Sequence, residues 1–207
     1  MARHLSVLLL TFVACTSSAP RARARFVLVD GDGDTVRLAA DARRVICLVP
    51  SATDLTVAMG LQSRLVGRTR YDKAPEIAQV ASVGGTIDPD LERVFALHPD
   101  LVLAWEGTKG TAQRQSISAH GIPVYAVALR DSAALFKTIR DLGTMLGSDS
   151  AATTLATSLR AQLDSVQASV AGLPRPTRQL RLQCQCPRAG IACPAWQDLS
   201  GQRRRAG

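Results

Sequence analysis

Few side chains in this sequence have both the type and the spacing that a catalytic site requires. Ser51 lies in Pro-Ser-Ala-Thr-Asp rather than in the Gly-x-Ser-x-Gly turn that exposes the nucleophile of many hydrolases. His98 and His120 each lie at the predicted end of a helix, where a partial positive charge is favourable. The sequence contains no phosphate-binding Gly-x-x-x-x-Gly-Lys, no Gly-x-Gly-x-x-Gly and no zinc-binding His-Glu-x-x-His. We therefore expect a protein that is not an enzyme, with a hydrolase as the disfavoured alternative.

The acidic run Asp-Gly-Asp-Gly-Asp at positions 30–34 suggests cation binding. An EF-hand loop needs Gly at its sixth position and a bidentate acid at its twelfth, and these positions hold Thr35 and the short Asp41 here. β-branched residues flank the run, and Asp and Gly are typical of tight turns. We therefore predict a hairpin turn between strands at residues 26–29 and 35–38, with a calcium loop as the alternative.

The cysteines give little support for metal or redox chemistry. Cys47 lies in an apolar run, which is typical of a small buried residue. Cys184, Cys186 and Cys193 have no matching His or Cys cluster elsewhere, and a disulfide in an exported protein stays an alternative for them. We expect neither a metal site nor a resident cofactor.

The net charge is distributed unevenly along the chain. The 207 residues have 46% hydrophobic content and a formal charge of +8, and a basic excess commonly indicates a polyanionic partner. Residues 26–177 nevertheless hold 15 basic and 16 acidic side chains, so the excess lies in the two ends. The body of the chain is nearly neutral, which argues against nucleic-acid binding.

Residues 1–25 have the pattern of an export signal followed by a short tether. The apolar run at residues 5–14 has the length of a secretory h-region and is too short to span a bilayer. Cys15 follows small and aliphatic residues, as in the lipobox of bacterial lipoproteins, and would be the lipidated residue. An ordinary signal peptide, cut near Ala14 or Ala19, is the alternative.

Apolar runs alternate with amphipathic segments from residue 45 onward. We predict strands at residues 45–49, 65–67, 80–83, 101–104 and 124–128, and helices at residues 51–60, 88–97, 108–119, 131–146 and 150–171. This alternation implies right-handed crossovers and a mostly parallel sheet flanked by helices, an α/β fold that ends in one long helix. Ser51, with Asp54 three residues later, predicts a capping box at the start of the first helix.

Six segments in register resemble a known family. They are Arg44–Asp54, Val66–Asp72, Val83–Gly85, Asp90–Leu97, Pro99–Trp105 and Gly121–Val124. Together they are similar to the N-terminal lobe of a periplasmic substrate-binding protein of the vitamin B12 and iron-siderophore importer family, closest to its cobalamin-binding branch. The similarity covers about residues 26–177.

The resemblance implies two α/β lobes joined by a long helix, with the ligand in the cleft between the lobes. It assigns residues 26–147 to the first lobe and residues 148–173 to the bridging helix.

The cleft of the cobalamin-binding relatives is lined by aromatic side chains on loops at strand ends, and Tyr71 and Trp105 match these positions. The alternative for Tyr71 is a surface aromatic residue, and the alternative for Trp105 is a residue that packs at the rim. Ser51, Gly85 and Glu106 are further candidates beside the cleft.

The resemblance also implies a function and a partner. Glu92 matches a surface glutamate that pairs with arginines of the membrane permease; the alternative is one solvated residue on a charged helix face. We expect a monomeric, exported component of an ATP-driven importer that binds cobalamin or another corrinoid. The alternative ligand is a ferric siderophore or haem, for which Arg68 and Arg70 lie near Tyr71 in the sequence.

The tail at residues 174–207 departs from the family pattern. A strand and a second lobe would follow Thr177, but this stretch has no sustained period of 2 or 3.6 and holds three of the five cysteines. We interpret it as a shifted reading frame or a truncated product, and expect the 207-residue chain to bind ligand weakly or not at all. A remnant without function, or an interaction protein outside transport, is the alternative of another class.

Overall fold

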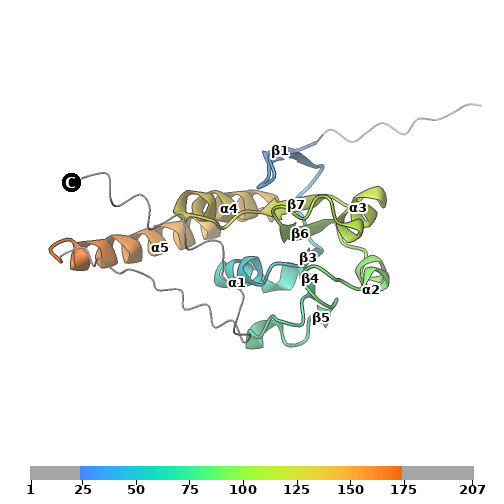
Figure 1. The fold of residues 1–207 in the computed structure, drawn as a ribbon, viewed down its shortest axis with the longest axis horizontal. Helices are drawn as coiled ribbons and strands as arrows, with labels where there is room; N and C mark the ends of the chain where they lie inside the picture. The colour runs from blue at the N-terminus through green and yellow to red at the C-terminus, as the bar shows by residue number, and fades with distance from the viewer. Residues whose placement is uncertain (1–23, 174–207) are drawn as a thin grey trace, which may run out of the picture. The chain divides into compact units, whose positions relative to one another are not determined.

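The computed structural model describes residues 24–173, and a five-stranded parallel sheet forms the centre of this part of the chain. Its strands are β3 (Val45–Cys47), β4 (Leu65–Arg68), β5 (Ala81–Ser82), β6 (Leu101–Trp105) and β7 (Val124–Val127). Their order across the sheet is β5-β4-β3-β6-β7, as the labels in Figure 1 show, and every neighbouring pair is parallel. The predicted α/β fold is confirmed.

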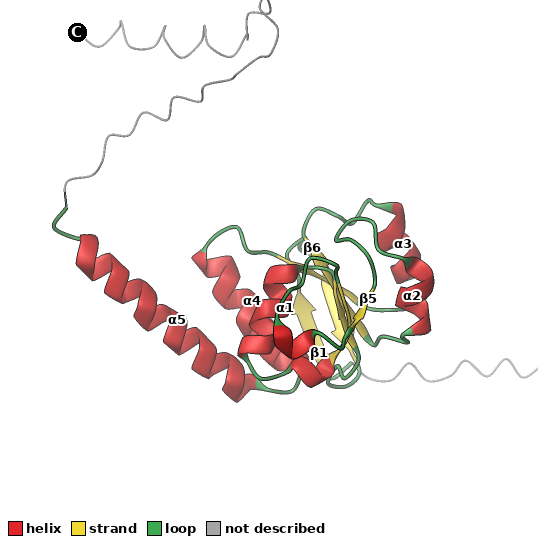
Figure 2. Cartoon of the chain, turned by 90° about the horizontal axis from the view of Figure 1, so that it is seen from below, coloured by secondary structure: helices red, strands yellow, loops and turns green. Residues whose placement is uncertain are grey.

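Five helices accompany the sheet. They are α1 (Pro50–Ala58), α2 (Leu91–Ala96), α3 (Ala112–Ala119), α4 (Ser132–Met145) and α5 (Asp149–Val170), with 3-10 turns at Gln62–Arg64 and Pro75–Ile77. The helices α1 and α4 lie on one face of the sheet, and α2 and α3 lie on the other (Figure 2). Both faces of the sheet are therefore covered, which explains why the central strands β3 and β6 are apolar along their whole length.

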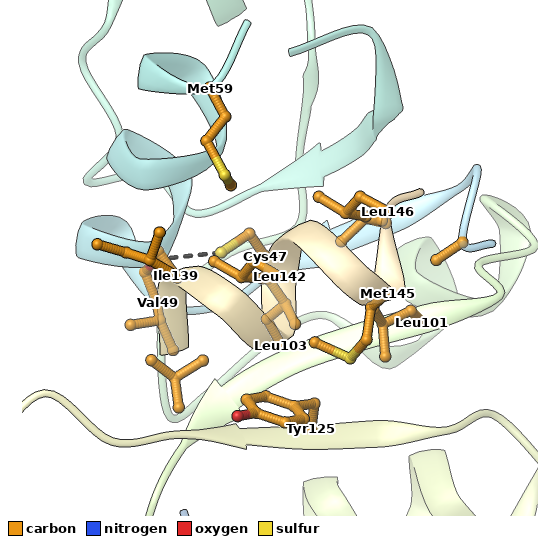
Figure 3. Close-up of a cluster of buried hydrophobic side chains, with 14 of the residues drawn as sticks. Cys47, Val49, Met59, Leu101, Leu103, Tyr125, Ile139, Leu142, Met145 and Leu146 are labelled. Atoms are coloured by element: carbon orange, nitrogen blue, oxygen red, sulfur yellow. Dashed lines mark hydrogen bonds between the residues drawn. The ribbon is translucent and has the colours of Figure 1, made fainter. Parts of the chain in front are cut away.

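Alternating side chains of the strands build the two cores. Val45 and Cys47 join the cluster beneath α1 and α4, while Ile46 points into the smaller cluster beneath α2 and α3. Figure 3 shows the larger cluster, in which the Cys47 thiol donates a hydrogen bond to the Val49 carbonyl at 3.1 Å. Cys47 is fully buried, as predicted.

The N-terminal hairpin is also confirmed. Strand β1 (Phe26–Val29) pairs antiparallel with β2 (Thr35–Leu38) across the acidic turn. Val36 and Leu38 face the larger core and are buried, so the hairpin packs on the sheet instead of standing free.

The starts of α1, α2 and α3 differ from the sequence prediction, and α2 begins at Leu91 rather than at residue 88 because Asp90 is its N-cap. Val49 is the N-cap of α1 and makes no side-chain cap bond, and Ser51 lies inside the first turn, so the predicted capping box is wrong. Pro50 begins the helix because its fixed φ suits that position. Helix α3 begins at Ala112 rather than at residue 108, because Thr111 caps it with its hydroxyl after a stretch of turns.

The last helix, α5, lies close to its predicted bounds. Leu155 and Leu159 pack against the larger core, whereas Leu163 further along the same stripe is 48% exposed. The chain divides into two units, Met1–Gln167 and Ala168–Gly207, and α5 extends across this division. In residues 24–173, no helix is long and apolar enough to cross a membrane. The predictions for Cys15 and for residues 174–207, with their three cysteines, lie outside the described residues.

Candidate functional site

The five predicted ligand residues all lie at or just after the carboxyl ends of strands. Ser51 comes after β3, Tyr71 after β4 and Gly85 after β5, while Trp105 ends β6 and Glu106 follows it. Because all five strands are parallel, these ends form one edge of the sheet. The structure therefore brings the predicted residues to the same edge, although they span more than fifty positions of the sequence.

The strand order also gives this edge a switch point. From β3 the chain proceeds to β4 on one side, and from β6 it proceeds to β7 on the other side. Ligands of open α/β sheets bind outside the carboxyl ends of the strands at such a point. The strands β3 and β6 flank this point, and Ser51 follows β3 while Trp105 ends β6.

Tyr71 is exposed and lies beside an arginine. The residue is 55% exposed, and the Arg70 guanidinium carbon lies 5.4 Å from the centroid of its ring. Arg70 also donates to the Asp88 carboxylate at 3.0 Å. Interactions with Tyr71 and then with Asp88 raise the pKa of the Arg70 guanidinium, which is cationic at neutral pH in any case.

A buried turn sets the position of Tyr71. The Thr69 main-chain N–H and hydroxyl both donate to one Asp72 carboxylate oxygen at 2.6 Å, and the Tyr71 N–H donates to the Thr69 hydroxyl oxygen at 3.1 Å. The guanidinium of Arg68 donates to four main-chain carbonyls, two of which belong to this turn (Thr69 and Asp72). Arg68 therefore holds the turn, and of the two arginines predicted near Tyr71 only Arg70 reaches its ring.

Gly85 has a steric reason to be glycine. A Cβ at this position would lie 1.8 Å from Oδ1 of Asp88 and 2.8 Å from Nη2 of Arg70. The absence of a side chain thus makes room for the ion pair that joins Arg70 to Asp88. Contact of Gly85 with a ligand stays a prediction.

Trp105 and Glu106 lie at the end of β6, and Glu106 has an ion-pair partner that was not predicted from the sequence. Trp105 is half-buried and packs against the larger core, as a rim residue would. The Glu106 carboxylate accepts a hydrogen bond from the guanidinium of Arg130. Arg130 follows β7, so the rule that strand ends share one edge was the signal that could have found it.

Glu92, the predicted docking residue, is exposed in the first turn of α2. The N-cap of this helix is Asp90, whose carboxylate accepts from the Arg93 N–H at 3.2 Å. An acid in the first turn also stabilises the helix dipole. Glu92 must be exposed both to pair with a permease and to be a solvated residue of a charged helix face, so its exposure agrees with both interpretations.

Comparison with known proteins gives one family and several partial relatives. Residues 45–184 match the periplasmic binding protein family. A vitamin B12-binding protein of Yersinia pestis (strain Pestoides F) is 42% identical over 88 residues, which are 41% of this chain and 30% of that protein.

Solved structures share the fold. The periplasmic vitamin B12 binding protein of Vibrio cholerae aligns with 63% of this chain and 52% of its own, at 23% identity and a TM-score of 0.57. A periplasmic heme binding protein from Pseudomonas aeruginosa aligns with 65% of this chain and 50% of its own, at 27% identity and a TM-score of 0.56. The chain therefore spans about half of these solved proteins and less than a third of the Yersinia relative. Since the family match covers more than half of its residues, the chain belongs to the periplasmic binding protein family.

Proposed function

We propose that the chain is an exported solute-binding component of an ATP-driven importer and that it binds cobalamin or a related corrinoid. The supporting observation is the gathering of Ser51, Tyr71, Gly85, Trp105 and Glu106 at one edge of the parallel sheet, across its switch point. The partial similarity to vitamin B12-binding proteins favours a corrinoid.

The chemistry of this edge suits a broad, flat ligand. A corrin ring presents a largely apolar face, and aromatic side chains supply contact area while losing little conformational entropy. Tyr71 follows β4 and Trp105 ends β6, on either side of the central strand β3. The two rings would therefore contact the ligand at separate points.

A second candidate ligand is a ferric siderophore or haem. Two arginines support it, because Arg70 lies over Tyr71 and Arg130 pairs with Glu106 at the same edge. Both ligand types carry anionic groups that a guanidinium binds well. The similarity to a periplasmic heme binding protein adds to this alternative.

The remaining parts of the chain have roles in the same proposal. Glu92 would pair with arginines of the permease, since exposed charges set docking register and encounter rate. Helix α5 would be the bridge to a second lobe, and Cys15 would anchor the exported chain to a membrane. Labelling of expressing cells with a radioactive fatty acid tests the anchor: wild type should incorporate label and Cys15→Ser should not.

Visible absorption and calorimetry test the ligand. Cyanocobalamin and ferric haem are titrated separately into the 207-residue chain and into a chain extended by the second lobe of a relative. We expect weak cyanocobalamin binding by the first and tight binding by the second. A haem spectrum that shifts on binding, with no heat from cyanocobalamin, would favour the second candidate, and no binding of either would contradict the proposed function.

A further inference from the structure

The acidic turn of the hairpin is fastened to the loop that follows β6. Oδ1 of Asp32 accepts a hydrogen bond from the Gly107 main-chain N–H at 2.6 Å, and Oδ2 lies 2.6 Å from Nη1 of Arg114. Gly107 is two residues beyond Trp105, and Arg114 lies in the first turn of α3. A single carboxylate thus joins the hairpin, the loop and the helix.

This junction is shielded from water. The side chains of Arg114, Asp30 and Asp32 are exposed by 8%, 0% and 11%. Oδ2 of Asp30 lies 3.4 Å from Nη2 of Arg114 and also accepts from the Ala126 N–H at 3.1 Å, which ties the turn to β7. Arg114 is the single guanidinium against two carboxylates, so loss of its charge would leave two shielded negative charges uncompensated.

A neighbouring ion pair provides a contrast. Lys109 and Asp34 also join the same loop to the same turn, at 2.7 Å, but their side chains are exposed by 65% and 40%. Exposed pairs of this kind contribute little to stability. Of the two links between turn and loop, the one through Asp32 is therefore the stronger constraint.

The loop transmits this constraint to the candidate ligand residues. The Trp105 carbonyl accepts from the Thr108 hydroxyl at 2.6 Å and from the Thr108 N–H at 3.4 Å, which closes a turn. Gly107 is the third residue of this turn, with a φ of +79° that favours glycine. Its N–H is the group that Asp32 binds, and the other central residue of the turn is Glu106.

We propose that Asp32 is a positioning residue for the ligand edge: it holds the Trp105–Thr108 turn against the hairpin, so that the indole of Trp105 and the carboxylate of Glu106 are in place before ligand arrives. A site that is ordered in advance loses less entropy on binding. The identity of the ligand rests on the proposed function, whereas the mechanical link from Asp32 to Trp105 does not.

Fluorescence of Trp105 tests the link without any ligand. The chain has two tryptophans, so Trp196→Phe is the background for every variant. Asp32→Ala removes the acceptor for Gly107 and the charge for Arg114, while Asp32→Asn keeps one carbonyl acceptor for Gly107 and replaces the oxygen that faces Arg114 with an uncharged NH2 donor. Asp34→Asn, in the exposed pair, is the matched control.

We expect Asp32→Ala to shift Trp105 emission to the red and to raise its quenching by acrylamide. Asp32→Asn should lower the melting temperature but keep the emission and quenching of the background protein. Asp34→Asn should leave the melting temperature, the emission and the quenching unchanged. If Asp32→Ala does not fold, Asp32→Ser replaces it, because a serine hydroxyl is too short to keep the bond to Gly107. A folded Ala or Ser variant with the emission and quenching of the background protein would overturn the inference.

Ligand titration then separates the inference from the proposed function. With cyanocobalamin as the probe, Asp32→Ala should bind about tenfold more weakly than the background, the cost of ordering one or two side chains on binding. Equal affinities alongside unchanged fluorescence would refute the positioning role and leave the function standing. Altered fluorescence in Asp32→Ala, with no cyanocobalamin binding by either protein, would support the positioning role and count against the function.

Discussion

The carboxylate of Glu106 pairs with the guanidinium of Arg130, across the carboxyl ends of two adjacent parallel strands. Glu106 directly follows β6, and Arg130 lies three residues beyond the end of β7. The pair occupies the edge where the predicted ligand residues gather. Whether this ion pair is formed or broken therefore decides whether the Arg130 guanidinium is free to bind a ligand.

Replacement of Glu106 tests this pair. Glu106→Gln should change the free energy of unfolding by less than about 1 kcal/mol, because the Arg130 side chain is exposed to solvent. It should strengthen binding of ferric haem relative to cyanocobalamin, since Arg130 becomes available to the haem carboxylates. Parallel titrations give the affinity ratio. Glu92→Gln, an equal charge change on α2, should leave that ratio as in wild type; an unchanged ratio in Glu106→Gln would remove Arg130 from the site.

Substitutions of Tyr71 separate contact area from hydroxyl chemistry. Tyr71→Phe should keep cyanocobalamin binding, because the flat ring provides the contact. Tyr71→Ala should weaken it by about 0.5–1.5 kcal/mol, and both variants should melt near the wild-type temperature, because the side chain is exposed. Calorimetric titration measures the affinities. Equal losses in the Phe and Ala variants would show that the hydroxyl matters, which favours an iron-bearing ligand.

The glycine at position 85 makes a steric prediction. Gly85→Ala should destabilise the protein by no more than about 1 kcal/mol, because the new methyl group would displace the exposed Asp88 carboxylate and weaken its ion pair with Arg70. Gly110→Ala is the control, since a Cβ there has no neighbour within 4 Å. Urea unfolding followed by circular dichroism compares the two variants. Similar losses of stability in both would contradict the collision.

The Cys47 thiol makes a prediction about pH. Burial, the largest effect, raises the pKa of this thiol from 9.0 to about 12. In the unfolded chain the thiol ionises from about pH 9, so the unfolded state binds fewer protons between these two values and stability falls as pH rises. Below pH 9 the stabilising contribution is complete. Urea unfolding between pH 8 and about pH 11 should show a shallower decline for Cys47→Ala than for wild type. Parallel curves for the two proteins would show that Cys47 does not contribute.

The periodic part of the structure was predictable from sequence. Apolar runs such as Val45–Val49 and the Asp131 N-cap of α4 depend on local spacing and local hydrogen bonds, and both predictions are confirmed in position. The capping role of Ser51 failed because Pro50, which fits the first helical position, moved the helix start ahead of it. Local spacing was therefore a good guide except at helix starts, where Pro50 and the Thr111 cap moved the first turn.

Long-range contacts were beyond sequence reasoning. Asp32 meets Gly107 across 75 positions and Arg114 across 82 positions, and no local pattern indicates which of the acids in the turn takes which partner. The common edge of the ligand candidates was predictable, because parallel strands place their carboxyl ends together. The ion pairs that order this edge depend on side-chain packing between neighbouring loops.

A nuclear magnetic resonance titration with cyanocobalamin tests the central claim most directly, because it locates even weak binding residue by residue. The diamagnetic ligand is added to the isotope-labelled 207-residue chain, and amide shifts are followed. The account predicts shifts concentrated at Ser51, Tyr71, Gly85, Trp105 and Glu106, with the amino ends of the strands unaffected. Shifts centred elsewhere, such as at the amino ends of the strands, would contradict a corrinoid site at the carboxyl edge of this sheet.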